Sequence, residues 1–292
     1  MTDNNTGFYF TNHNTRLACH HQGNPNSPHM LICLHGLASN ATRWDEFIEH
    51  TSLRESMELF AMDLRGHGRS MTFRRFTRAD WIDDIHCLIQ QRDKSAILVG
   101  HSMGAQIALD YASQYAEQAD LDGLVLIDPV FPEALTGVLK KVARFRQLIN
   151  VATFILRGFY RLGLHKRQYP YRDLRALDNQ TREFLANNPH KTIAELYMNP
   201  FADLAYIPYA NYLQDLYEVT RPLQTLRRIH VPVLVLLSQG ASTSHVDINR
   251  RILGELSQLD IRTIDADHWL LTEKPVEARQ EIEQWCHERV GL

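Results

Sequence analysis

Apolar and polar positions along the chain fall into two alternating patterns, short apolar runs and longer segments with helical spacing. The runs at 30–34, 96–99, 124–127 and 233–237 contain no polar residue, which is typical of strands covered on both faces. Further strands are expected at 8–11, 16–20, 58–62 and 261–264. Helical spacing occurs around 41–50, 80–90, 105–115 and 276–287. This order predicts an α/β fold with a mostly parallel sheet of eight strands and helices on both faces.

The segment 129–221 interrupts this alternation. It is rich in helical spacing and has no strand-like run, so we interpret it as a helical cap inserted into a core formed by residues 1–128 and 222–292. Its last part is aromatic, with Tyr197, Phe201, Tyr206, Tyr209, Tyr212 and Tyr217. These rings either line a pocket beneath the cap or form the cap's own core, and the pattern favours neither.

The first part of the cap is basic. No acidic residue lies between Glu133 and Asp173, whereas nine Lys and Arg residues do. Apolar residues near helical spacing predict a basic amphipathic helix here, and they are Val138, Val142, Phe145, Ile149, Leu156 and Phe159. We favour a helix that packs its apolar face on the core and exposes its charges to water. The alternatives are a weak contact with a lipid surface and the attraction of anionic substrates.

A serine between two glycines joins the apolar run at 96–99 to the helix that follows. The residues are Gly100-His101-Ser102-Met103-Gly104. A sharp strand-to-helix turn holds such a serine in a strained backbone conformation, and the glycines allow close packing around it. The helix N-terminus adds backbone N–H groups and a positive potential beside a developing oxyanion. Ser102 is therefore the candidate nucleophile.

A general base and an oxyanion site can be placed by the same topology. His268 follows the last expected strand, at the carboxyl edge where an open α/β sheet carries its site, and it is the candidate base. His35-Gly36 follows the run at 30–34, where the loop is expected to donate a backbone N–H. We predict that the N–H groups of Leu37 and Met103 bind the oxyanion.

Three further residues adjoin these groups, namely His35, His101 and Trp269. We include them as candidate substrate-binding residues. For the imidazole of His35, a structural hydrogen bond within the loop is the favoured role.

The motifs together resemble the α/β-hydrolase superfamily, in the branch of esterases and lipases with a helical cap after the sixth strand. The matching residues are His35-Gly36, Asp63-Leu64-Arg65-Gly66-His67-Gly68-Arg69-Ser70, Gly100-His101-Ser102-Met103-Gly104 and Asp267-His268. The resemblance covers 1–128 and about 229–292, whereas the cap matches only in being helical. It implies that 63–67 shape the core without a catalytic role. The family's dehalogenases and epoxide hydrolases use aspartate at the position of Ser102, so the serine argues against them.

The acid that should orient His268 departs from the commonest pattern. Family members usually supply it from the loop after the seventh strand, but here 238–245 contain no Asp or Glu, and Asp247 is expected in the next helix. Asp128 directly follows the run at 124–127, next to the nucleophile strand. A turn-initiating role before Pro129 is its alternative. We assign Asp128 as the acid, ahead of Asp247 and of Asp267, whose side chain should diverge from its neighbour His268.

The composition of the chain indicates which partners and cofactors are not expected, but it does not indicate a function. The net charge of −3 and the pI near 6.6 indicate no nucleic-acid partner. Cys33 and Cys87 lie in apolar runs and are expected to be buried thiols, and the scattered positions of the four cysteines fit a cytoplasmic protein. No signal peptide, no apolar stretch of about 20 residues and no metal-ligand cluster is apparent, so stable membrane insertion, a metal and a cofactor are not expected.

These observations predict a cofactor-independent serine hydrolase that cleaves carboxylic esters with short to medium acyl groups. A C–C bond hydrolase, a lactonase or a hydroxynitrile lyase on the same fold are alternatives. A non-catalytic small-molecule receptor is the alternative from another class, because the fold alone does not fix the function.

Overall fold

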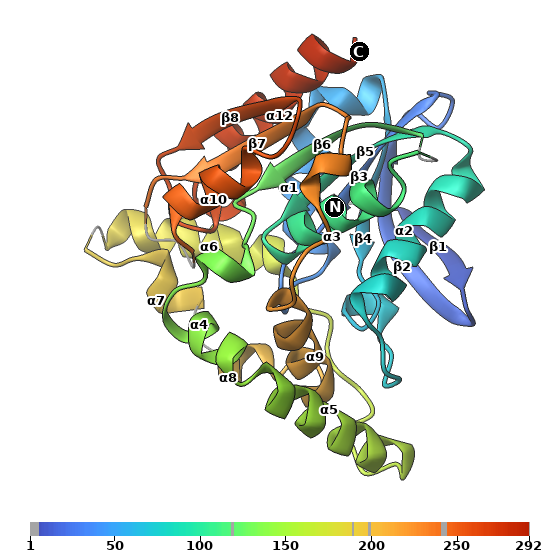
Figure 1. Cartoon of the computed structure of the whole chain (residues 1–292), viewed down its shortest axis with the longest axis vertical. Coiled ribbons are helices and arrows are strands. Elements are labelled where there is room, and N and C mark those ends of the chain that lie inside the picture. The colour runs from blue at the N-terminus through green and yellow to red at the C-terminus, as the bar shows by residue number, and fades with distance from the viewer. Residues whose placement is uncertain (1–5, 118–119, 189, 198–199, 241–243, 292) are drawn as a thin grey trace.

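The apolar runs of the sequence form the central strands of one twisted sheet (Figure 1). The computed structural model describes residues 6–117, 120–188, 190–197, 200–240 and 244–291. Within them the strand order is β1-β2-β4-β3-β5-β6-β7-β8, with β2 antiparallel to β1 and β4 and all other pairs parallel. This confirms the predicted mostly parallel eight-stranded sheet. The strands are β1 (Thr6–Asn12), β2 (Thr15–Gly23), β3 (His29–Leu34), β4 (Glu58–Asp63), β5 (Ser95–His101), β6 (Leu121–Ile127), β7 (Val233–Ser238) and β8 (Leu259–Ile264).

Helices cover both faces of the sheet, and each face has its own apolar core. Successive strand residues point to opposite faces, so Ile32 and Leu34 join one core while Leu31 and Cys33 join the other. The first core is covered by α2 (Arg78–Arg92), α3 (Met103–Gln114) and α10 (Val246–Leu253). The second is covered by α1 (Asp45–His50), α11 (Leu270–Glu273) and α12 (Pro275–Val290). Short 3-10 helices are η1 (Ala41–Trp44), η2 (Ser52–Glu55), η3 (Gly68–Ser70), η4 (Pro132–Ala134) and η5 (Leu226–Arg228).

The cysteines follow the expectation only in part. Cys33 is fully buried within the second core. Cys87 lies on α2 and remains partly exposed, so its assignment as a buried thiol was wrong. The reason is that Ile85, Leu88 and Ile89 form the buried face of α2, whereas Cys87 packs against the first core only partly.

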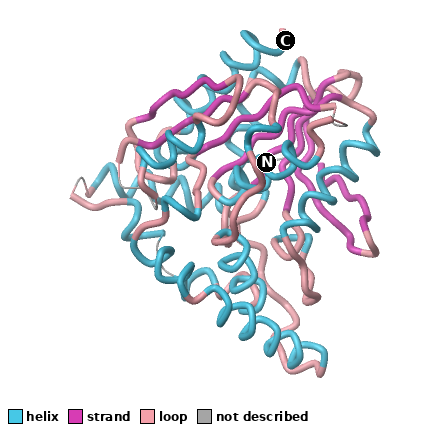
Figure 2. Tube along the Cα trace, viewed as in Figure 1, coloured by secondary structure: helices cyan, strands magenta, loops and turns pink. Residues whose placement is uncertain are grey.

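Between β6 and β7 the described residues form helices and loops, and Figure 2 shows this part on one side of the sheet. The helices are α4 (Gly137–Arg144), α5 (Arg146–Arg161), α6 (Leu174–Asn187), α7 (Ile193–Tyr197), α8 (Pro200–Asp203) and α9 (Tyr209–Val219). They belong to the segment interpreted above as a cap. Residues from α4, α7 and α9 line one cavity together with Ser102 and His268, so these helices lie over the carboxyl edge of the sheet.

The basic amphipathic segment differs from its prediction in two ways. It forms two helices, α4 and α5, which meet at Phe145. Its predicted apolar face does not pack on the core, because Val138, Phe145 and Phe159 expose 62%, 54% and 47% of their surface and the other three residues of that set are only half-buried. The buried side of α5 instead carries Thr153, Arg157 and Tyr160. The favoured packing arrangement was therefore wrong.

The loop after β4 connects the sheet to the cap. The carboxylate of Asp63 accepts hydrogen bonds from the backbone N–H groups of Ala41 and Arg69, at 2.8 and 2.7 Å, which fixes the turn. His67 Nε2 lies 2.8 Å from the carboxylate of Asp215 on α9, and both residues are buried. The motif at 63–70 thus has a structural function, in agreement with the expectation that it shapes the core.

The pair of His67 and Asp215 should make folding stability depend on pH. Burial opposes the charged imidazole, but the carboxylates of Asp215 and Asp63 and the carbonyl of Arg65 outweigh it, so the pKa of His67 is raised. Stabilisation by the charged pair is therefore complete below the pKa of a free histidine, about 6.5, and is lost as pH rises through the raised value.

We expect Asp215→Asn to lower the free energy of unfolding by about 3 kcal/mol at acidic pH near 6. The deficit should shrink as pH rises, because the wild type then loses the charged pair as well. Urea titrations at a series of pH values measure this difference. A deficit that stays constant across the series would contradict the assigned charge of His67.

Candidate active site

Ser102 lies in a strained turn between β5 and α3. Its backbone angles are φ 54° and ψ −110°, a conformation that costs a residue with a Cβ about 1–3 kcal/mol. The turn is held by a hydrogen bond from Ser102 N to Ile127 O, at 2.9 Å. A Cβ built on Gly104 would lie 2.2 Å from the Leu34 carbonyl oxygen, and one on Gly100 would lie 2.4 Å from the Gly104 backbone. Only glycine fits at either position.

His268 connects the serine to a carboxylate. Its Nε2 lies 2.9 Å from Ser102 Oγ, and its Nδ1 is hydrogen-bonded to Asp128 Oδ2. Both His268 and Asp128 are buried. An ionised carboxylate can only accept, so the neutral ring carries its proton on Nδ1. This tautomer leaves Nε2 free to accept the proton of the serine hydroxyl.

Asp128 is held in place at the end of β6. Its Oδ1 accepts hydrogen bonds from Ser238 N and Ser238 Oγ, at 3.1 and 2.9 Å. Burial acts to raise the pKa of Asp128, but the hydrogen bond and charge of His268 and the two bonds from Ser238 outweigh it and lower the pKa. The carboxylate is therefore ionised at neutral pH. Sequence reasoning did not find Ser238, although its place at the end of the neighbouring strand β7 could have indicated it.

The other two candidate acids lie elsewhere. Asp247 is in the first turn of α10 and is exposed, as expected for a residue beyond the loop. A carboxylate oxygen of Asp267 occupies the space beside Gly240, where a built Cβ would lie 2.3 Å from it. The structure thus brings Asp128 to His268 Nδ1 and leaves Asp247 apart. The catalytic roles of Ser102, His268 and Asp128 stay predictions.

His101 has a function that the sequence did not indicate. It lines the cavity, as expected of a substrate-binding candidate, but its Nε2–H also donates to the His268 carbonyl oxygen, at 3.0 Å. Burial, the charge of His268 and that of Arg43 lower the pKa of His101 to about 3, so the ring is neutral. His101 therefore positions the loop that carries His268. The partners are 167 residues apart, which hides this contact from any local motif.

The loop after β3 approaches the serine with its backbone. A Cβ built on Gly36 would lie 3.4 Å from Ser102 Cβ, and Leu37 lines the cavity. Met103 is the first residue of α3, where backbone N–H groups have no partner inside the helix. The assignment of the Leu37 and Met103 N–H groups to an oxyanion is consistent with these positions and stays a prediction.

The substrate-binding assignment of His35 was wrong. The ring is fully buried and does not line the cavity. Its Nδ1 lies 2.8 Å from Gly36 O and its Nε2 accepts from Leu64 N, at 3.1 Å. Burial and the neighbouring His67 keep its pKa well below the usual value. The imidazole therefore joins the loops after β3 and β4, which is the structural role that the sequence favoured.

A mostly apolar cavity of about 500 Å³ opens at Ser102. Its lining includes Leu37, Val130, Val138, Leu139, Val142, Leu174, Tyr197, Tyr212, Leu216, Val219 and Trp269. The charged lining residues Arg43, Arg172 and Asp203 are paired, since Arg43 binds Asp178 and Arg172 lies 2.6 Å from Asp203. Of the aromatic segment at 197–217, Tyr197 and Tyr212 line the cavity, whereas Phe201 and Tyr209 are exposed. Trp269 lines it as expected.

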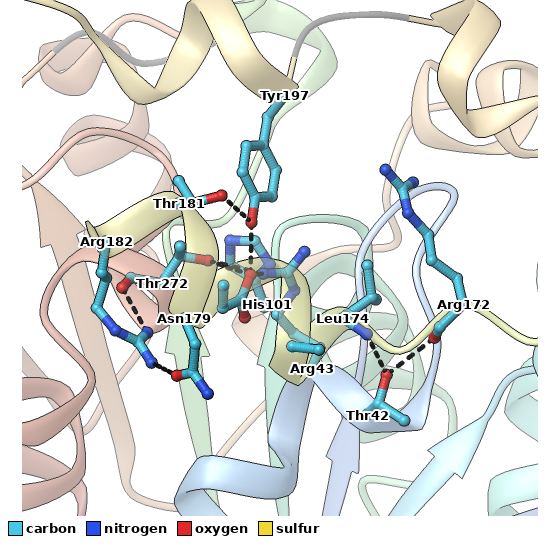
Figure 3. A network of polar contacts seen from close by, with 12 residues as sticks. Thr42, Arg43, His101, Arg172, Leu174, Asn179, Thr181, Arg182, Tyr197 and Thr272 are labelled. Atoms are coloured by element: carbon cyan, nitrogen blue, oxygen red, sulfur yellow. Dashed lines mark hydrogen bonds and ion pairs between the residues drawn. The ribbon is translucent and has the colours of Figure 1, made fainter. Parts of the chain in front are cut away.

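A polar network joins α6 and α7 to η1 and α11 beside this cavity (Figure 3). Arg43 on η1 donates to Asp178 on α6 and to Thr272 Oγ1 on α11, the latter at 2.7 Å. The hydroxyl of Tyr197 donates to the same carboxylate, at 2.5 Å. Residues of η1, α7 and α11 therefore share the buried carboxylate of Asp178 on α6, close to the loop of His268. In the part of the chain that the structure describes, no cluster of His, Cys, Asp and Glu has the arrangement of a metal site.

Comparison with known proteins identifies related chains. The family model described as the Alpha/beta hydrolase family matches residues 31–280. Protein phosphatase methylesterase 1 of Candida albicans is 29% identical over 114 residues, which cover 37% of this chain and 31% of that protein. Lipase LipV of Mycobacterium tuberculosis is 29% identical over 127 residues, covering 43% of this chain and 44% of that protein. The matches span less than half the length of these curated relatives.

A solved structure extends the likeness over nearly the whole chain. A thermophilic esterase from Thermogutta terrifontis superposes with a TM-score of 0.68, covering 97% of this chain and 98% of that one. The sequence identity is 19%, so this likeness shows the fold alone.

We predict that Ser238→Ala slows the reaction of Ser102 with a fluorophosphonate probe. Losing the hydroxyl removes one hydrogen bond to the Asp128 carboxylate, and the inactivation rate constant should fall about tenfold. Ser113→Ala is the matched control, because Ser113 is also buried but donates to Thr225 O, at 2.9 Å, remote from the site. Equal rates for both variants would contradict the proposed support of Asp128 by Ser238.

Proposed function

The chain belongs to the α/β hydrolase family, and from this premise we propose that it is a serine hydrolase that cleaves carboxylic esters through an acyl-enzyme. The observation that carries the proposal is the hydrogen-bonded series from Ser102 Oγ through His268 to Asp128, at one end of an apolar cavity. A serine is a weak nucleophile until an oriented base accepts its proton. This arrangement supplies both the base and the group that orients it.

In the proposed cycle, Ser102 Oγ attacks the ester carbonyl carbon while His268 Nε2 takes the hydroxyl proton. The imidazolium that forms is stabilised by the ionised Asp128 at Nδ1. His268 then gives the proton to the leaving alkoxide, and the C–O bond breaks to leave an acyl-serine. A water molecule then attacks the acyl carbonyl carbon while His268 Nε2 takes one of its protons. The second tetrahedral intermediate breaks its bond to Ser102 Oγ, which receives the proton back from His268, and the carboxylic acid is released.

The carbonyl oxygen becomes negatively charged at each tetrahedral step. We assign the backbone N–H groups of Leu37 and Met103 to bind it. Leu37 belongs to the loop that approaches Ser102, and Met103 is the first residue of α3. Preorganised backbone donors of this kind contribute about 3–4 kcal/mol each to transition-state stabilisation. The dipole of α3 acts in the same direction.

The cavity favours uncharged esters with short to medium acyl groups. Its lining is mostly apolar, and the described cations at its wall are already matched by Asp178 and Asp203. An anionic substrate that binds Arg43 would have to break its buried pair with Asp178, which costs several kcal/mol, whereas the pair of Arg172 and Asp203 is only half-buried. A volume of about 500 Å³ accommodates an ester of moderate size rather than a long-chain lipid extended within the cavity.

Turnover of p-nitrophenyl esters of rising acyl length tests the function. We expect a maximum of kcat/KM at short to medium chains, with complete loss of turnover in Ser102→Ala at unchanged melting temperature. Lactones, amides and C–C substrates are measured in parallel. Turnover of one of these without any ester hydrolysis would contradict the proposed substrate class. It would not contradict the assignment of Ser102 as the nucleophile.

A second prediction concerns the acid. Asp128→Asn should lower kcat on the order of 10²–10⁴-fold with little change in KM, because the loss falls on the chemical step. Asp247→Asn makes the same chemical change on exposed α10 and should have little effect. Steady-state kinetics of both variants with one ester distinguish the two acids. Full activity of Asp128→Asn would refute the assignment.

A further inference from the structure

Helix α5 turns its apolar side away from the protein. The exposed residues, called here the α5 face, are Phe145, Leu148, Val151, Phe154, Ile155 and Phe159. We propose that the α5 face and the cations around it dock the protein on the surface of an anionic lipid bilayer. The proposal adds a binding surface to the protein and does not depend on the ester chemistry.

The orientation of α5 is the reverse of an ordinary surface helix. The residues of the α5 face recur at intervals of three and four, so they form one stripe along the helix. The opposite side carries Thr153, Arg157 and Tyr160, which are buried against the protein. Arg157 donates to Phe73 O, at 2.9 Å, on that inner side. Two polar residues and a tyrosine thus face the protein, and the large apolar residues of the α5 face lie toward the solvent.

Cations surround the α5 face without acidic neighbours along the chain. Exposed basic residues flank it at both ends, and they are Lys140, Lys141, Arg144, Arg161, Lys166 and Arg167. No Asp or Glu occurs from 134 to 172, although the whole chain carries a net charge of −3. An apolar stripe bordered by cations is the pattern of helices that lie in the interface of an anionic bilayer.

A bilayer fits this surface better than a second copy of the chain. In a twofold dimer the same patch would meet itself, so the cations of both copies would approach each other with no acidic residue of this segment to offset them. Anionic headgroups would neutralise them instead. Figure 1 shows α5 along the outer edge of the molecule, away from the sheet. None of the described helices combines the length and apolar character needed to cross a bilayer, so the contact would be interfacial.

Docking would also bring the cavity to the lipid. Val138 lines the cavity and yet exposes 62% of its surface, and it lies on α4, directly before α5. Leu139 and Val142 of the same helix line the cavity as well. An uncharged ester dissolved in the membrane interface would therefore meet the cavity without crossing bulk water.

Co-sedimentation with vesicles tests the proposal on the full chain. We expect binding to phosphatidylcholine vesicles with about 30% phosphatidylglycerol, much weaker binding to pure phosphatidylcholine, and loss of binding near 0.5 M NaCl. Phe154→Ser with Ile155→Ser should weaken the partition coefficient about tenfold or more, because two exposed apolar side chains no longer insert. Leu148→Ser with Val151→Ser provides an independent pair.

Matched controls separate the α5 face from general effects. Arg161→Gln, Lys166→Gln and Arg167→Gln together should weaken binding to anionic vesicles by about tenfold or more. Arg250→Gln with Arg251→Gln removes exposed cations from α10 and should leave binding unchanged. All variants alter exposed residues and should keep the melting temperature of the wild type.

Several outcomes would overturn the proposal. Absence of binding to anionic vesicles would do so, as would equal binding of the wild type and both serine pairs. Light scattering after size exclusion adds a further test. A wild-type dimer that Phe154→Ser with Ile155→Ser converts to a monomer would assign the α5 face to a second copy of the chain. Esterase turnover is measured separately, so its failure and the failure of docking can be distinguished.

Discussion

The backbone turn at Ser102 is the constraint on which the rest of the site depends. A positive φ at a serine persists only because neighbouring strands and α3 fix both of its ends, through the Ile127 carbonyl and the contact of Gly104 with Leu34. Asp128, at the end of the adjacent strand, also has a positive φ of 43°. Two strained strand ends thus project their side chains toward His268. The parallel sheet supplies the rigidity that keeps three distant residues within hydrogen-bond reach.

The parts of this arrangement that could be predicted are those recorded in local sequence. The glycines around Ser102 indicate a sharp turn, and the apolar run before Asp128 indicates a strand end. Both features can be recognised from a few adjacent residues. The contacts of Ser238 with Asp128 and of His101 with His268 join residues more than a hundred positions apart. They depend on strand order and loop path, which no local pattern contains.

The cap shows a different limit. Apolar periodicity identified an amphipathic segment near Phe145 and Phe159, but periodicity does not say whether the apolar side meets the core or the solvent. The inner side of α5 is instead filled by Thr153, Arg157 and Tyr160, of which Thr153 donates to Ile149 O and one guanidinium nitrogen of Arg157 donates to Phe73 O. Likewise, His35 was included among the substrate-binding candidates because it adjoins the site in sequence. The next residues, Gly36 and Leu37, line the cavity, whereas the imidazole of His35 does not.

The central claim is that the strained serine is the activated nucleophile of this fold. Peptide mapping by mass spectrometry, after one equivalent of a fluorophosphonate has reacted with the native protein, tests this most directly. The account predicts a single phosphonyl adduct on the peptide that contains Ser102 and none after denaturation in urea before labelling. An adduct on any other serine, or no adduct in the native protein, would contradict it.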